Sequence, residues 1–301
     1  MKDDPEMCNE PGRLPSWLRK KKSLRDLRSM KILFRSACLS TVCEEARCPN
    51  ITECFRSPTA TFMILGDVCT RKCAFCSVKK GFPCLPDEQE PEKMALAASK
   101  MGLDHVVITS VTRDDLPDHG ASAFARSIRK VRQALPCSSV EVLTPDFSGN
   151  VSHAEIVFKH EPDVFNHNVE TVGRLYRSIR PGARLETSLE LLKAAREYDD
   201  SLVVKSGFMV GLGETEEEIH ELIVSLHQAG CDIITIGQYM QPTKKQVPVQ
   251  RYWHPERFEA WSELAKNLGI RYAVSGPLIR SSYRAKEALE MVRLTRRKTW
   301  E

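Results

Sequence analysis

The sequence has no long apolar run of the kind that spans a membrane. Its 301 residues contain no stretch of about eighteen consecutive apolar side chains, and its first five residues begin neither an apolar signal core nor an Arg- and Ser-rich leader. We therefore expect a cytoplasmic protein with no membrane partner. The 42% apolar content still provides a large core, so the length allows one α/β barrel or two ordinary domains.

A large excess of charge of one sign is missing too. The 44 basic and 40 acidic residues leave a net charge of only +4, which gives no ground for a nucleic-acid partner. Basic residues are concentrated locally, because nine of them stand against the single acid Asp26 between Pro11 and Arg35. This stretch is either a solvated N-terminal arm or a docking surface for an acidic partner.

Fixed-period repeats are also absent, and the chain instead alternates strand-like and helix-like patterns. Strands are predicted at 61–65, 105–109, 140–143, 164–166, 202–210, 233–237 and 272–274, and helices at 91–100, 121–134, 189–197 and 255–267. A further helix begins at a capping box of Thr215 and Glu218 and ends at Gly230. Six such units favour an α/β fold with a partial, TIM-like (β/α)6 barrel over an eight-stranded one.

A flat doubly wound sheet with a dinucleotide site is the alternative architecture. Gly211 and Gly213 begin a glycine pattern, but Glu216 occupies the place of the third glycine. The acidic residues at this helix start would also repel a pyrophosphate. The sequence therefore predicts no dinucleotide site here.

Disulfides are not expected among the eleven cysteines, because the cytoplasm is reducing and a chain of this length needs no staples. Five cysteines are scattered, as buried small hydrophobes would be, and six are bunched. The more specific group is Cys69, Cys73 and Cys76, which follows the first predicted strand. No histidine lies near it to complete a zinc site, whereas three thiolates can hold a cubane cluster and leave one iron open for a cofactor. With Phe75 before the third cysteine, this run resembles the signature of the radical S-adenosylmethionine superfamily.

A second triplet, Cys43, Cys48 and Cys54, implies a second cluster, because one cluster cannot use six thiolates. The pairing of the two triplets resembles the lipoyl synthase family. The resemblance extends over nearly the whole chain and is carried by LPSWL (14–18), CEEARCPNITEC (43–54), GDVCTRKCAFCSV (66–78), TSVTRDDLPDHGA (109–121), FNHNVETV (165–172), KSGFMVGLGET (205–215) and RSSY (280–283).

The resemblance implies a sulfurtransferase that inserts two sulfur atoms at C6 and C8 of an octanoyl chain amide-linked to a lysine of a lipoyl carrier domain. Its cofactors would be two 4Fe–4S clusters and S-adenosylmethionine, the source of 5′-deoxyadenosyl radicals, and the auxiliary cluster would donate the sulfur. Unactivated C–H bonds offer nothing to a general base, which is why a radical is needed. The implied partners of this monomer are the lipoyl domain of a 2-oxoacid dehydrogenase E2 or a glycine-cleavage H protein, a flavodoxin or ferredoxin, and a cluster-rebuilding protein.

The resemblance also assigns residues. The Cys69 triplet binds the catalytic cluster, and the Cys43 triplet with Ser282 binds the auxiliary cluster, with Ser281 as the neighbouring possibility. A serine before a helix is more usually an N-cap, and that reading stays open. Residues at strand ends are candidates for binding S-adenosylmethionine: Thr109, Ser110, Asn166, Asn168, Glu170, Arg180, Lys205 and Met209.

Several of these assignments have alternatives. Arg180 either reaches the cofactor carboxylate or caps a helix, and Arg71 and Lys72 either tune the cluster or face solvent. His167 is more plausibly a hydrogen-bonded structural residue than a ligand. Met209 with Val210 and Leu212 either lines an acyl channel or belongs to the core.

The predicted organisation has three parts: a basic arm with the auxiliary cysteines (1–58), the radical S-adenosylmethionine barrel (59–275), and a C-terminal serine motif with a helix (276–301). We expect both clusters to face each other at the mouth of the barrel. Two rival functions remain: another radical enzyme with an auxiliary cluster, acting on a different substrate or a peptide, and a non-enzymatic metal-binding module whose basic arm binds nucleic acid.

Overall fold

The fold is built on one curved sheet. The computed structural model describes residues 14–19, 40–41, 45, 50 and 59–298. The sheet has the order β1-β2-β5-β6-β7-β8-β9-β10, and only the β1–β2 pair is antiparallel. Its strands are β1 (Ser40–Thr41), β2 (Thr59–Ile64), β5 (His105–Ser110), β6 (Ser139–Leu143), β7 (Val164–Asn166), β8 (Val203–Val210), β9 (Ile233–Gln238) and β10 (Tyr272–Gly276).

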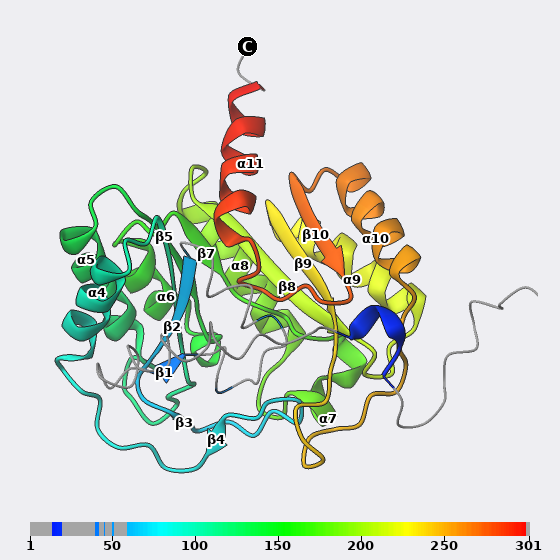
Figure 1. Cartoon of the computed structure of the whole chain (residues 1–301), viewed down its shortest axis with the longest axis horizontal. Coiled ribbons are helices and arrows are strands. Elements are labelled where there is room, and N and C mark those ends of the chain that lie inside the picture. The colour runs from blue at the N-terminus through cyan, green and yellow to red at the C-terminus, as the bar shows by residue number, and fades with distance from the viewer. Residues whose placement is uncertain (1–13, 20–39, 42–44, 46–49, 51–58, 299–301) are drawn as a thin grey trace, which may run out of the picture.

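A helical crossover joins each parallel strand to the next (Figure 1). The crossovers contain α4 (Glu90–Lys100), α5 (Ala121–Ala134), α6 (Val151–Phe158), α7 (Tyr176–Ile179) with α8 (Leu185–Tyr198), α9 (Glu216–Gln228) and α10 (Pro255–Leu268). Six strand-and-helix units followed by β10 match the predicted partial barrel. In the described part of the chain no pairing joins the two edge strands β1 and β10, so the barrel is open.

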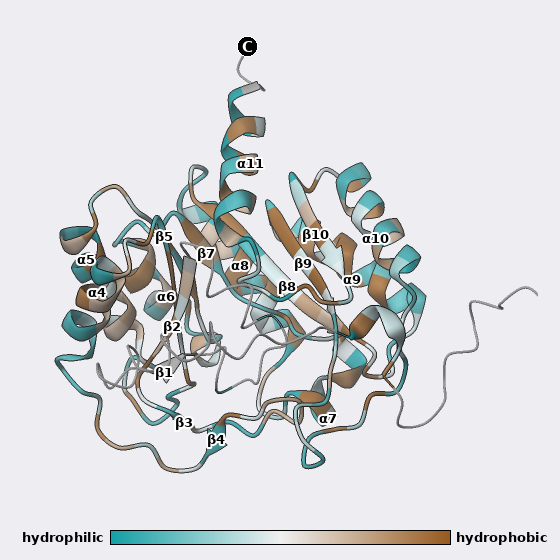
Figure 2. Ribbon diagram, in the orientation of Figure 1, coloured by the Kyte–Doolittle hydropathy of each residue, from teal (hydrophilic) through white to brown (hydrophobic). Residues whose placement is uncertain are grey.

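The strands are buried because the helices cover the outer face of the sheet. β9 is buried at every position, and all but the last residue of β5 are buried, as parallel strands covered on both faces should be. Figure 2 shows the apolar colour concentrated in the strands and on the inward faces of the helices. None of the described helices combines the length and apolar content that a membrane span requires.

Helix α9 begins and ends at the predicted signals. The Thr215 hydroxyl accepts from the Glu218 amide, and the Glu218 carboxylate accepts from the Thr215 amide, which completes the capping box of α9. Gly230 follows the helix at φ 81°, in the left-handed region. The first glycine of the pattern, Gly211, is needed for packing, because an added Cβ would be 2.1 Å from Nε2 of Gln238.

The base of the barrel, formed by the amino ends of the strands, is closed by α11 (Ala285–Lys298). Three strand residues point to the inner face of the sheet: Val164, Val203 and Ile233. They pack against α11 in a cluster that is separate from the main core. On the α11 side this cluster contains Ala288, Leu289 and Val292. Figure 1 shows α11 at one end of the sheet and α7 at the other, near β3 (Val68–Cys69) and β4 (Lys79–Lys80).

The connection 277–284 between β10 and α11 lies against the inner face of the sheet. A Cβ added to Gly237, near the carboxyl end of β9, would stand 2.2 Å from the Ile279 carbonyl oxygen. Gly237 therefore lets the backbone of the connection approach the strand more closely than any side chain would allow. The connection leads from the carboxyl end of β10 to the helix at the base.

Candidate active site

The loop that holds Cys69, Cys73 and Cys76 crosses the carboxyl ends of the strands. Backbone hydrogen bonds attach it to three other segments: Thr70 N donates to Thr112 O (3.1 Å) after β5, Ala74 N to Ile179 O (2.9 Å) in α7, and Val247 N to Ala74 O (3.1 Å) after β9. All three cysteines are half-buried and free. The fold thus places the triplet at the barrel mouth, where active sites of such barrels lie.

Arg71 fixes the middle of this loop. Its guanidinium makes a two-point contact with Asp114 (2.8 and 2.9 Å) and a 2.5 Å contact with Asp146, and only 9% of its side chain is exposed. Burial lowers the pKa of Arg71, but the two carboxylates raise this pKa by more than burial lowers it. The Arg71 guanidinium therefore stays charged. The solvent-facing alternative is therefore wrong for Arg71 and correct for Lys72, which is exposed.

The three cysteines form one electrostatic group. Burial raises the pKa of the Cys76 thiol to about 11, and the charges of Cys73 and Cys69 raise it as well. For Cys73 burial is again the main cause of a raised pKa, which Arg180 counteracts and Glu170 reinforces. Among the described residues no three His, Cys, Asp or Glu side chains are arranged around a single metal ion. Three adjacent soft thiols on one loop fit a cluster, in which each ligand binds a different iron.

Two of the residues expected at S-adenosylmethionine have buried polar atoms without a partner in the described part of the chain. These atoms are the Ser110 hydroxyl at the end of β5 and Asn166 Oδ1 at the end of β7. Buried polar atoms rarely stay unpaired in native proteins. Both atoms therefore suit a polar ligand at the barrel mouth.

Glu170 adds a strained backbone to the same region. Its φ is 66°, which is unusual for a residue other than glycine, and its amide and carbonyl bond to Gly207 and Met209 of β8. Burial raises the pKa of the Glu170 carboxyl, which Arg180 and a hydrogen bond from Asn168 lower in part. Met209, beside it, is half-buried against the main core.

The other expected cofactor residues are already engaged with protein groups. Thr109 donates to Leu143 O (2.8 Å), and Arg180, the residue that follows α7, donates to Asn168 O (3.0 Å) and Val169 O (3.2 Å). Lys205 lies between the two oxygens of Glu141 (2.9 and 3.1 Å) and is 1% exposed. These three side chains therefore stabilise the strands and loops around the site through hydrogen bonds to other protein groups.

His167 is a structural residue, as its context predicted. One ring nitrogen pairs with Thr144 O and the other with the Ser188 hydroxyl, each at 2.9 Å. Burial lowers the pKa of His167 to about 4, and the Arg180 charge lowers it too, so the ring is neutral at physiological pH. Val210 and Leu212 are fully buried members of the main core, and the core alternative is correct for both.

The serine motif reaches the same mouth from the C-terminal side. Ser281 accepts a hydrogen bond from Asn166 Nδ2 (2.9 Å) and donates to Asn168 Oδ1 (3.1 Å). Ser282 is half-buried in the turn that follows, and α11 begins only at Ala285. Neither serine stands at the residue before the helix, so the N-cap alternative is wrong.

The auxiliary cysteines Cys43, Cys48 and Cys54 lie outside the described residues, but two of their sequence neighbours are described. Glu45 O accepts from the Ser77 hydroxyl (2.5 Å), next to Cys76. Asn50, fully buried, donates to Leu278 O (2.5 Å) in the serine connection. The two described residues from the segment between these cysteines therefore contact the catalytic loop and the connection that leads into the serine motif.

Several residues that support the site were not predicted from the sequence. Glu141 is a lone acid in an apolar strand, which is the one signal that could have revealed it, and it also accepts from Asn166 (2.8 Å). Asp114 and Asp146 gave no comparable signal, because their role depends on a loop that is remote in sequence. Of the scattered cysteines, Cys231 is buried as expected, but Cys84 and Cys137 are exposed, so the buried interpretation is wrong for both.

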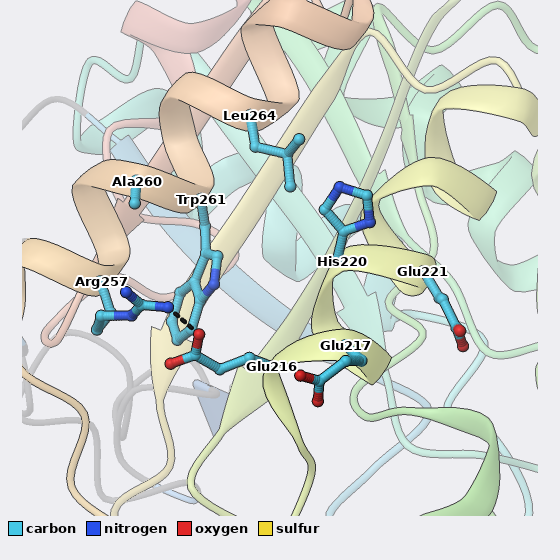
Figure 3. Close-up of a pocket in the computed structure, with 8 residues that line it drawn as sticks. All are labelled: Glu216, Glu217, His220, Glu221, Arg257, Ala260, Trp261 and Leu264. Carbon is cyan, nitrogen blue, oxygen red and sulfur yellow. Dashed lines mark hydrogen bonds and ion pairs between the residues drawn. The ribbon is translucent and has the colours of Figure 1, made fainter.

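A separate groove of about 400 Å³ lies between α9 and α10 (Figure 3). Trp261 and Leu264 form its apolar side, and acidic side chains of α9 stand opposite, one of them, Glu216, paired with Arg257. None of its lining residues is a predicted site residue. The groove therefore belongs to the helical exterior of the barrel and not to the cysteine site.

Comparison with known proteins agrees with this geometry. Residues 63–226 match the family model of the radical SAM superfamily. The lipoyl synthase of Caldanaerobacter subterraneus subsp. tengcongensis is 50% identical over 93% of this chain and 99% of its own, and that of Rubrobacter xylanophilus is 53% identical over 88% and 83%.

Solved structures share the fold at low identity. Streptococcus suis SuiB bound to S-adenosylmethionine aligns with a TM-score of 0.56 at 14% identity, over 84% of this chain and 61% of its own. Methylornithine synthase aligns with a TM-score of 0.52 at 12% identity, over 92% and 90%. The chain belongs to the lipoyl synthase family of radical S-adenosylmethionine enzymes.

Proposed function

We propose that the chain inserts two sulfur atoms, at C6 and C8, into an octanoyl group carried on a lysine of a lipoyl carrier domain. The observation that carries this proposal is the meeting of three segments at one mouth: the catalytic loop, the neighbours of the auxiliary cysteines and the serine connection. The contacts of Ser77 with Glu45 and of Asn50 with Leu278 join them. A reaction between two clusters and one alkyl chain needs this proximity.

In this proposal Cys69, Cys73 and Cys76 hold the catalytic 4Fe–4S cluster, and Cys43, Cys48 and Cys54 with Ser282 hold the auxiliary one. When bound, the first cluster with S-adenosylmethionine supplies a carbon radical, and the second supplies sulfur. Serine oxygen is a poorer ligand than thiolate for iron in a soft-ligand cluster, so its iron is the easiest to release. The three parts of the chain, 1–58, 59–275 and 276–301, would carry the auxiliary cluster, the barrel chemistry and the releasable ligand.

The chain's own side chains prepare the cofactor site. Ser110 and Asn166 offer unpaired polar atoms at strand ends, and Glu170 offers a carboxylate that faces Arg180. Arg71, buried between Asp114 and Asp146, keeps the cysteine loop in one position relative to these strands. The proposed partners are the octanoylated carrier (an E2 lipoyl domain or H protein), a flavodoxin or ferredoxin as electron donor, and a protein that rebuilds the auxiliary cluster.

The decisive experiment incubates the reconstituted protein with an octanoylated lipoyl domain, S-adenosylmethionine and a reductant without oxygen. Mass spectrometry of the carrier should show the gain of two sulfur atoms, with no net loss of hydrogen in the reduced dithiol product and a loss of two hydrogens after its oxidation to the cyclic disulfide. S-adenosylmethionine cleavage without any mass gain on the carrier would point to a different substrate and would reject the proposal.

Iron analysis tests the two cluster assignments separately. We expect about eight irons per reconstituted chain, and about four in each of the variants Cys43→Ala and Cys69→Ala. A colourless zinc protein with salt-dependent affinity for nucleic acid would instead support the metal-binding module. Loss of all iron in either variant would contradict two independent clusters.

A further inference from the structure

The two serines of the RSSY motif have different surroundings. Ser281 makes two hydrogen bonds, one to Asn166, the last residue of β7, and one to Asn168, two residues further on. Ser282 makes no hydrogen bond with any described residue and is half-buried in the next position of the turn. The two hydroxyls therefore differ in their hydrogen bonding: that of Ser281 is used within the protein, and that of Ser282 is not.

The direction of both Ser281 bonds is determined by neighbouring carboxylates. Asn166 directs its Nδ2 to Glu141 Oε1 (2.8 Å), and Glu141 is fixed in turn by Lys205. Asn168 also makes a side-chain hydrogen bond with the Glu170 carboxylate. Each amide must point its nitrogen at a carboxylate, so Asn168 turns its oxygen towards Ser281.

The Ser281 hydroxyl therefore has a partner on each side. It accepts from the nitrogen of Asn166 and donates to the oxygen of Asn168. The hydroxyl of Ser281 is thus suited to holding the backbone, not to binding metal.

The backbone before the serines is held from both sides. Asn50, between two of the auxiliary cysteines in the sequence, donates to Leu278 O, and Gly237 admits the Ile279 carbonyl against β9. Ser281 supplies the third attachment from within the turn, which Tyr283 N closes by donating to Arg280 O (2.9 Å). Three attachments within four residues leave little freedom to Ser282.

We infer that Ser281 is a positioning residue: bridged between Asn166 and Asn168, it fixes the turn so that Ser282 alone is presented to the auxiliary cluster. This inference rests on the proposed function, because it assumes the auxiliary cluster. It assigns Asn166 and Asn168 a second task, as the anchor of the releasable ligand. Ser282 would then be held in place by its neighbour's hydrogen bonds, which do not depend on a bond between Ser282 and iron.

The test compares Ser281→Ala, Ser281→Thr and Ser282→Ala in the full-length chain with both clusters reconstituted, with Ser262→Ala as the matched control. Ser262 lies on α10, outside the site, and its hydroxyl donates to Ala273 O of β10. Mild ferricyanide oxidation removes the least firmly held iron, and the resulting 3Fe–4S signal is followed by electron paramagnetic resonance. A parallel series carries Cys69→Ala, so that the signal comes from the auxiliary cluster.

We expect Ser282→Ala to lose iron fastest and Ser281→Ala to lose it faster than wild type by a factor of about five to thirty, as the removal of one or two hydrogen bonds predicts. Ser281→Thr should retain the wild-type rate because it keeps the hydroxyl, and so should the control. Hydrogen exchange in the peptide 278–284 of the cluster-free protein should also speed up in Ser281→Ala.

Equal iron loss and equal exchange in Ser281→Ala and wild type would overturn the inference. So would a fast Ser281→Ala beside an unaffected Ser282→Ala, which would make Ser281 the ligand. If the Cys69→Ala chain holds no cluster at all, the proposed function fails and the inference with it. A cluster that is held but insensitive to Ser281 rejects the inference alone.

Discussion

At the scale of single residues, the buried ion pair inside the barrel determines more than either partner's sequence context suggested. Glu141 is fully buried and accepts from Lys205 and Asn166, with His105 Nε2 3.6 Å away. Ser281 is attached to this group through Asn166. The polar group therefore connects the barrel interior with the serine motif.

Removing one charge of this pair should destabilise the fold strongly. We expect Lys205→Met to lower the free energy of unfolding by ~3–5 kcal/mol, because it leaves an uncompensated buried carboxylate. Urea denaturation followed by circular dichroism measures the loss. The double variant Glu141→Leu with Lys205→Met should recover much of it, and a double variant as unstable as the single one would contradict the charge argument.

The same carboxyl should give stability a pH dependence in acid. Burial would raise the pKa of Glu141, but Lys205 and His105 lower it from 4.5 to about 2. A group whose pKa is lower in the folded state contributes stability that is complete above the unfolded pKa and is lost as pH falls through the folded one. Stability should therefore decline from about pH 4.5 towards pH 2, and denaturation across this window should show a shallower decline in Lys205→Met.

At the scale of elements, the connection 277–284 depends on a glycine in a neighbouring strand. Gly237→Ala would place a methyl group 2.2 Å from the Ile279 carbonyl oxygen, so the connection must shift. We expect a loss of ~1–3 kcal/mol in the free energy of unfolding and faster hydrogen exchange in 278–284. Gly173→Ala is the control, because its new methyl group meets Leu185 only at 3.4 Å. Equal effects of the two variants would show that the close approach is unimportant.

The elements themselves were largely predictable, and the exceptions have physical causes. All seven predicted strands are present, because buried parallel strands are short apolar runs bounded by turns. The predicted helix 189–197 begins earlier, at Leu185, and α6 was not predicted although Asn150 caps it. β3 and β4 have two residues each and exist through their pairing, which no local pattern reveals.

At the scale of the whole molecule, α11 completes the core at the base of the barrel. Leu289 is 1% exposed against the ends of three strands, whereas Leu294 on the same helix is 52% exposed. Leu289→Ala should cost ~2–5 kcal/mol of unfolding free energy, and the matched Leu294→Ala should stay within ~0.5 kcal/mol. Thermal and urea unfolding of both variants give the comparison, and similar costs would mean that α11 does not close the base.

The site was predictable where chemistry is local and not where it depends on the fold. The spacing of Cys69, Cys73 and Cys76 can be recognised in the sequence because it lies within eight residues. The pairing of Lys205 with Glu141 and the hydrogen bond from Asn166 to Ser281 join segments that are distant in the sequence. They form only because the fold brings these segments together, so the sequence does not predict them. Lone residues at strand ends look alike in sequence, and only the fold decides which of them face a ligand.

The connection from β10 to α11 makes the C-terminal helix and the serine motif one continuous piece. Arg293 and Arg296 of α11 pair with Asp163 and Asp232, the residues just before β7 and β9. These ion pairs hold α11 at the base of the sheet, and the helix in turn holds the end of the connection that contains Ser282. A domain fused after α11 would load these two ion pairs, and Ser282, the ligand that we propose for the auxiliary cluster, lies three residues before the helix, so an affinity tag is better placed elsewhere.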